Sequence, residues 1–179
     1  MNYKIRQDTD PLSPSEYADV SLFIVANHRD FYVAEPGEKR VPVSASDLLK
    51  KYKKTHWIFP MEAYIHSGVV LALSGEGNFP DRRWDVSQLG YVFAAKSEWR
   101  LSAKAREAAL AHIEDWNRYL LGDVWGYVIE DDDGTHVDSC WGYYDKKLCE
   151  EDAVQALASA ENNAENKKLF STGQLSLKL

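Results

Sequence analysis

The chain has 179 residues, a net charge of −7 and 45% hydrophobic residues. This length suits one folded domain with its own core, and the composition excludes a disordered chain. The acidic balance excludes a uniformly basic nucleic-acid-binding protein, and no apolar run reaches the ~20 residues that span a bilayer. We therefore expect a soluble cytoplasmic protein without direct contacts to nucleic acid or membrane.

The first quarter of the chain predicts two strands and a short helix. Residues 1–17 contain two prolines and predict an irregular lead-in, and residues 21–27 and 30–35 predict strands. Ser44, with an acid three residues later, predicts a helix start. The Lys-Lys-Tyr-Lys-Lys run that follows places cations where the helix dipole favours them, and a phosphate site is the alternative interpretation of this run.

The middle of the chain predicts more strands and one long helix. Residues 56–74 predict two strands that turn at Ser67-Gly68, residues 75–85 a loop, and residues 88–96 another strand. A helix over residues 103–121 has apolar positions that step by three and four. These positions are Ala105, Ala109, Ile113, Trp116 and Leu120.

The segment 125–144 predicts a hairpin that turns at Asp133-Gly134. In this register Tyr127 pairs with Cys140, and each tryptophan lies opposite a glycine. The two pairs are Gly126 with Trp141 and Trp125 with Gly142. We expect Cys140 to be buried against Tyr127.

The last third of the chain ends in a helix and a tail. Residues 148–164 predict the helix, and residues 165–179 a tail that forms an edge strand or contacts a second copy in a homodimer. The order of elements predicts an α+β fold with a mainly antiparallel sheet of about five to seven strands. Two longer helices and one short helix pack on this sheet, in a single domain over residues 18–164.

The net charge comes from one segment. Residues 130–152 contain nine acids and two lysines, so their excess equals the charge of the whole chain. Such a patch attracts a basic protein surface or only improves solubility. The candidate partner-binding residues are Glu130, Asp131, Asp132, Asp133, Glu150, Glu151 and Asp152.

Most catalytic and metal-binding chemistry is disfavoured by spacing. His136 and Cys140 share one face of a strand at a separation of about 13 Å, far beyond the reach of a Cys–His pair. The chain contains no zinc-ligand spacing, no calcium-loop spacing and no glycine-rich phosphate loop. We therefore predict no catalytic residue, no metal and no cofactor.

A small-molecule pocket is the alternative to a docking surface. Polar groups flanked by aromatic residues are typical of ligand sites, and structural contacts are the competing explanation. The candidate pocket residues are His66, Trp84, Asp85, Gln88, Asp138 and Cys140.

Three stretches in order carry a family resemblance. They are YIHSGVVLALS (64–74), RWDVSQLGYVFAAK (83–96) and WNRYLLGDVWGYVIEDDDGTHVDSCWGYY (116–144). Over residues 57–144 this pattern resembles a family of uncharacterised proteins encoded in bacteriophage and prophage genomes. The second stretch departs from the family's Trp-Asp-Ser-Gly-Gln-like spacing.

The resemblance implies an accessory gene of a phage or mobile element, with no established activity. Our first hypothesis is a non-enzymatic inhibitor of a host nucleic-acid-handling or defence system, such as CRISPR or restriction. It would dock on the basic nucleic-acid-binding surface of a host protein through the acidic hairpin and the helix after it. The alternative is a small-molecule or nucleotide-binding protein or enzyme with a pocket around His66, Asp85 and Asp138.

Overall fold

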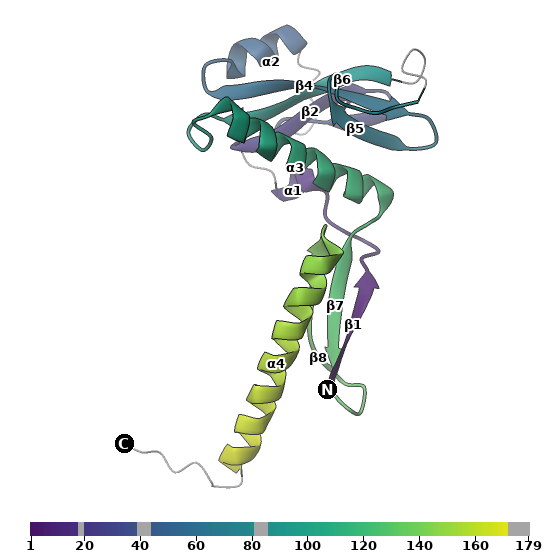
Figure 1. Ribbon diagram of the computed structural model, residues 1–179, viewed down its shortest axis with the longest axis vertical. Coiled ribbons are helices and arrows are strands. Elements are labelled where there is room, and N and C mark those ends of the chain that lie inside the picture. Colours follow the sequence, from purple (N-terminus) through teal and green to yellow (C-terminus); the bar gives the residue numbers. More distant parts are fainter. Residues whose placement is uncertain (18–19, 39–43, 81–85, 172–179) are drawn as a thin grey trace. The chain divides into compact units, whose positions relative to one another are not determined.

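The computed structural model describes residues 1–17, 20–38, 44–80 and 86–171 (Figure 1). It confirms the α+β class and the antiparallel pairing, with the strands of these residues divided between sheets of three and five. Contacts divide the chain into two compact units, Leu12–Leu121 and Met1–Pro11 with Gly122–Leu179. We call them the five-stranded unit and the three-stranded unit. The single domain expected over residues 18–164 stays a prediction, and residues from 18 to 164 fall in both units.

The five-stranded unit contains an antiparallel sheet in the order β3-β2-β6-β4-β5. Its strands are β2 (Leu22–His28), β3 (Phe31–Val33), β4 (His56–Ile65), β5 (Val69–Leu73) and β6 (Val86–Ala95). Its helices are α1 (Pro14–Tyr17), α2 (Ala45–Tyr52) and α3 (Ser102–Leu121). The helix predicted after Ser44 and the turn predicted between residues 56 and 74 are both confirmed.

Helices α2 and α3 cover opposite faces of this sheet (Figure 1). The predicted stripe of α3 is confirmed: four of its five positions are buried against the sheet, and Leu120 packs beside them half-buried. On the other face, α2 packs Leu48 and Tyr52 against Phe23 and Phe93. The short α2 covers only part of its face, so the sheet beyond Phe23 and Phe93 needs other cover.

Strands β2 and β6 approach each other unusually closely at Gly90. A Cβ atom at this position would lie 1.9 Å from the carbonyl oxygen of Val25. Gly90 pairs with Ala26 on one side and with Met61 on the other, next to a bulge in β4. A glycine is therefore required where three strands meet.

The three-stranded unit joins the start of the chain to its end. Strand β1 (Asn2–Gln7) pairs with β7 (Trp125–Glu130), which pairs with β8 (His136–Tyr143). Helix α4 (Lys146–Ser171) packs on this sheet through Cys149 and Ala153, which contact Tyr127 and Ile129. Because β1 completes this sheet, the irregular lead-in expected over residues 1–17 is wrong for residues 2–7.

Helix α4 is also longer than the predicted helix over residues 148–164. It continues through Ser171, so the predicted tail of residues 165–179 is helical in its first part. Residues 172–179 lie outside the described residues. None of the described helices is long and apolar enough to cross a membrane.

The hairpin register is confirmed in its centre and differs at both ends. Tyr127 pairs with Cys140, as predicted, and the two neighbouring pairs agree. The turn has three residues, not two, because Asp131 N–H donates to the carbonyl of Thr135, and Gly134 adopts a φ of 80°. The extra residue is absorbed by a bulge between Ile129 and Glu130.

The two predicted tryptophan–glycine contacts have different outcomes. Trp141 lies over Gly126, where a Cβ atom would come within 2.3 Å of its ring. Trp125 instead pairs with Tyr143, because Gly142 adopts a φ of 85° and forms a bulge. One contact is therefore confirmed and the other is replaced by an aromatic pair.

We predict that Gly90→Ala lowers the free energy of unfolding by about 3 kcal/mol or more, since its methyl group overlaps backbone that cannot move freely. Urea unfolding of the purified chain measures this. Gly68→Ala is the matched control, since a Cβ there meets nothing within 4 Å. Equal stability of the two variants would contradict the close approach of β2 and β6.

Candidate functional site

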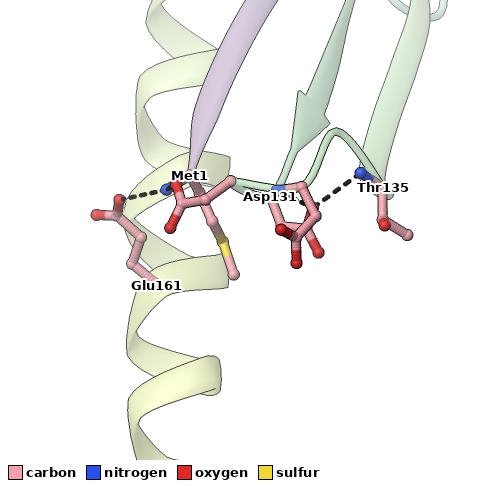
Figure 2. Close-up of polar contacts among 6 residues, drawn as sticks. Met1, Asp131, Thr135 and Glu161 are labelled. Carbon is pink, nitrogen blue, oxygen red and sulfur yellow. Dashed lines mark hydrogen bonds and ion pairs between the residues drawn. The ribbon is translucent and has the colours of Figure 1, made fainter.

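The acidic hairpin uses much of its charge internally. Asp131 accepts hydrogen bonds from the backbone N–H groups of Asp133 and Thr135, at 3.0 and 2.8 Å, and so builds the turn. Asp132 pairs with the amino group of Met1 at 2.9 Å, and the same amino group lies 3.9 Å from Glu161. Figure 2 shows Met1 directed toward Glu161, and Asp131 toward Thr135.

Glu130 is also neutralised locally. It accepts a hydrogen bond from Lys4 at 2.5 Å and lies 3.7 Å from Arg6, both on the neighbouring strand β1. The hydrogen bond from Lys4 holds the pKa of Glu130 below its usual range. The sequence could not assign these cations to Glu130, because β1 was expected to be irregular.

Some of the predicted acids of α4 also have partners within the fold, and others do not. Glu151 pairs with Lys147 at 3.6 Å, one helical turn away, and Asp152 accepts a hydrogen bond from Tyr143 at 3.0 Å. Within the described part of the chain, no ion pair or side-chain hydrogen bond reaches the carboxylates of Asp133 and Glu150. Among the described residues, these two are the predicted acids whose carboxylates have neither an ion pair nor a hydrogen bond.

The four predicted pocket residues that the structure describes lie in separate parts of the fold. Gln88 lines a cavity on the five-stranded sheet, and His66 is exposed in the turn between β4 and β5. Asp138 and Cys140 lie on β8, in the three-stranded unit. Trp84 and Asp85 lie outside the described residues. Of the six, Gln88 alone lines this cavity, among the residues that the structure describes.

The burial expected for Cys140 is wrong, because β8 is an edge strand and this thiol is exposed. The buried thiol is Cys149, which α4 packs on Tyr127. Burial raises the pKa of Cys149 to about 11, so this thiol is protonated and unreactive at neutral pH. Both cysteines are free.

The best-formed site lies on the α2 face of the five-stranded sheet. This cavity, which we call the α2 cavity, has a volume of about 380 Å³, within the range of small-molecule sites. Strands β2 and β6 form its floor, α2 one wall, and the segment after β3 another. Apolar and polar side chains line it, including Val25, Asn27, Glu35, Leu48, Gln88 and Tyr91.

Glu35 is the buried charged group of this cavity, which the exposed Glu38 also lines. It is 6% exposed, and its Oε2 atom accepts from Lys51 Nζ at 2.5 Å and from Tyr52 Oη at 2.6 Å. Burial alone would raise the pKa of Glu35, but these two hydrogen bonds outweigh it and hold the pKa below its usual range. Glu35 is therefore ionised at neutral pH.

The second oxygen of Glu35 is available to a ligand. Within the described residues, no donor reaches Oε1, and no fully buried side-chain oxygen lacks a hydrogen bond. Oε1 is therefore not fully buried, and Glu35 lines the cavity. A buried carboxylate with one open oxygen is a strong acceptor for a donor group.

Sequence reasoning missed Glu35, although it ended a predicted strand. Its partners Lys51 and Tyr52 belong to the Lys-Lys-Tyr-Lys-Lys run, which the sequence explained by the helix dipole or a phosphate. Comparisons of the chain with models of protein families, with curated proteins and with solved structures found no match. Within the described residues, no group of three or more acidic, histidine or cysteine side chains is placed to hold a metal.

We predict that Glu35→Gln costs about 1–3 kcal/mol of unfolding free energy at pH 7, because charge-assisted hydrogen bonds are lost. The folded pKa of Glu35 is depressed, so its stabilisation is present above the ordinary value of 4.5 and is lost as pH falls below it. The difference between wild type and variant should therefore shrink toward pH 3 in urea unfolding. Glu98→Gln, at an exposed carboxylate, should leave stability unchanged; an equal loss there would contradict this role of Glu35.

Proposed function

We propose that the five-stranded unit binds a small molecule in the α2 cavity. The observation that carries this proposal is the buried Glu35 carboxylate, which lines a cavity of about 380 Å³ and whose Oε1 receives no hydrogen bond from the described residues. Burying a charge is costly unless every acceptor position is satisfied. Lys51 and Tyr52 donate hydrogen bonds to Oε2 of Glu35, and a ligand that donates one to Oε1 would satisfy the second oxygen of this carboxylate.

The charges around the cavity favour a neutral or cationic ligand. Glu35 and Glu38 line it, and Lys51, which pairs with Glu35, compensates one of these two charges. The amide groups of Asn27 and Gln88 add polar contacts, and Val25 and Leu48 supply apolar surface. The ligand class is therefore a compact molecule with one apolar ring or chain and one amine or hydroxyl donor.

Three probes of similar size test this ligand class: phenethylamine, 2-phenylethanol and phenylacetate. Titration calorimetry on the full chain should give the tightest binding for phenethylamine and the weakest for phenylacetate. We expect a difference of about tenfold or more between the amine and the carboxylate. Glu35→Gln should reduce this difference, because the variant removes the charge that distinguishes the probes.

A blocking variant locates the probe. Ala45 lines the α2 cavity from the exposed first residue of α2, so Ala45→Trp fills the cavity without disturbing the core. This variant should abolish phenethylamine binding, and Glu98→Gln should leave it intact. Binding that survives Ala45→Trp, or no binding of any probe at millimolar concentration, would overturn the proposal.

Docking on a host protein is the second candidate function. The exposed carboxylates of Asp133 and Glu150, which no described side chain neutralises, support it. The chain would then inhibit a host nucleic-acid-handling or defence protein, in the phage or mobile-element setting that its resemblance implies. Docking would depend on these two acids, because Glu130, Asp131 and Asp132 already form ion pairs or hydrogen bonds within the chain.

A plating assay tests the docking function. Bacteria with an active restriction or CRISPR system should plate phage at least about tenfold better when they express the chain. The double variant Asp133→Asn with Glu150→Gln should lose this effect, because charge complementarity is removed. Glu98→Gln is the control. Unchanged plating with the wild-type chain, or a fully active double variant, would contradict this function.

A further inference from the structure

A second cavity lies on the opposite face of the five-stranded sheet, between α3 and the edge strand β3. It has a volume of about 500 Å³ and is distinct from the α2 cavity, although the segment from Ala34 to Glu38 borders both. We call it the α3 cavity. Its lining includes Ser13, Phe31, Glu35, His112, Trp116 and Tyr119.

Three aromatic rings give this cavity its shape. Phe31 and Trp116 meet edge to face, with centroids 5.7 Å apart and planes at 87°. Trp116 and Tyr119 repeat this arrangement at 6.0 Å and 88°. Rings held at right angles offer both faces and edges, which suits a flat aromatic guest.

His112 supplies a polar group with a defined direction. The indole Nε1–H of Trp116, one helical turn away, donates to His112 Nε2 at 3.3 Å. An indole N–H can only donate, so Nε2 is the acceptor and the proton of the neutral ring lies on Nδ1. Burial lowers the pKa of His112 to about 4, which keeps the ring neutral at physiological pH.

The Nδ1–H group of His112 is left for a ligand. Within the residues that the structure describes, no acceptor for this N–H is found. The other side chains of the cavity are aromatic, aliphatic or hydroxylic, and its charged groups are the carboxylates of Glu35 and Glu38. These carboxylates disfavour an anion, and a neutral histidine does not compensate for them.

We propose that the α3 cavity is a second ligand site, which takes a neutral aromatic ring that carries a carbonyl or ring-nitrogen acceptor. The ring packs among Phe31, Trp116 and Tyr119, and the acceptor receives the Nδ1–H of His112. This class differs from the donor-bearing ligand of the α2 cavity, because the recognising group here is a donor and there an acceptor.

Benzamide, toluene and benzoate separate the contributions of ring, acceptor and charge. In calorimetry on the full chain, benzamide should bind about threefold to tenfold more tightly than toluene, the range of one neutral hydrogen bond. Benzoate should bind more weakly than benzamide. His112→Phe keeps the aromatic volume and removes the donor, so it should reduce benzamide to the affinity of toluene.

The histidine ring itself reports binding without any substitution. Long-range ¹H–¹⁵N spectra of the wild-type chain should show the proton of His112 on Nδ1, and benzamide should shift this nitrogen while toluene leaves it unchanged. Ala45→Trp should preserve benzamide binding, and His112→Phe should preserve phenethylamine binding, because the two cavities are separate. A proton on Nε2, no response to benzamide, or loss of benzamide binding in Ala45→Trp would overturn the proposal.

Discussion

A buried carboxylate must be paired, and in the five-stranded unit this requirement falls on Glu35. Its contacts with Lys51 and Tyr52 connect the segment after β3 to α2, two parts of the chain that are sixteen or more residues apart. Tyr52 in turn packs on Phe23 and Phe93, so the polar contact continues into the core of this face. The same contacts leave Oε1 open, which is why the group that anchors the wall of the cavity also gives it chemistry.

The short helix α2 and the edge strand β3 explain why this unit has cavities on both faces of its sheet. An eight-residue helix cannot cover a face of five strands, and a three-residue edge strand leaves the sheet incomplete beside α3. The segment from Ala34 to Glu38 fills part of both gaps. Glu35 lines both cavities, whereas the neutral His112 lines the α3 cavity and not the α2 cavity, so the two cavities differ in this donor.

In the three-stranded unit, a high density of acids in the sequence does not mean that all of these charges are free to contact a partner. The acids of the hairpin are consecutive in sequence, but the turn, the amino group of Met1 and the cations of β1 engage three of them. Buried or ion-paired charges serve the fold, and a partner can recognise only what remains. The docking function that we propose as the second candidate would therefore depend on Asp133 and Glu150, which are far apart in sequence but belong to one unit.

The sequence by itself determined the α+β class, the α3 stripe, the helix start at Ser44 and the centre of the hairpin, because each depends on neighbours in the chain or on a regular period. Only the tertiary structure decided the strand β1, the two units and the position of Cys140, since these depend on pairing between distant segments. The candidate binding sites also belong to the features that only the tertiary structure decided. Glu35, Lys51 and His112 carry no local signature, and their roles come from burial and from partners that folding brings together.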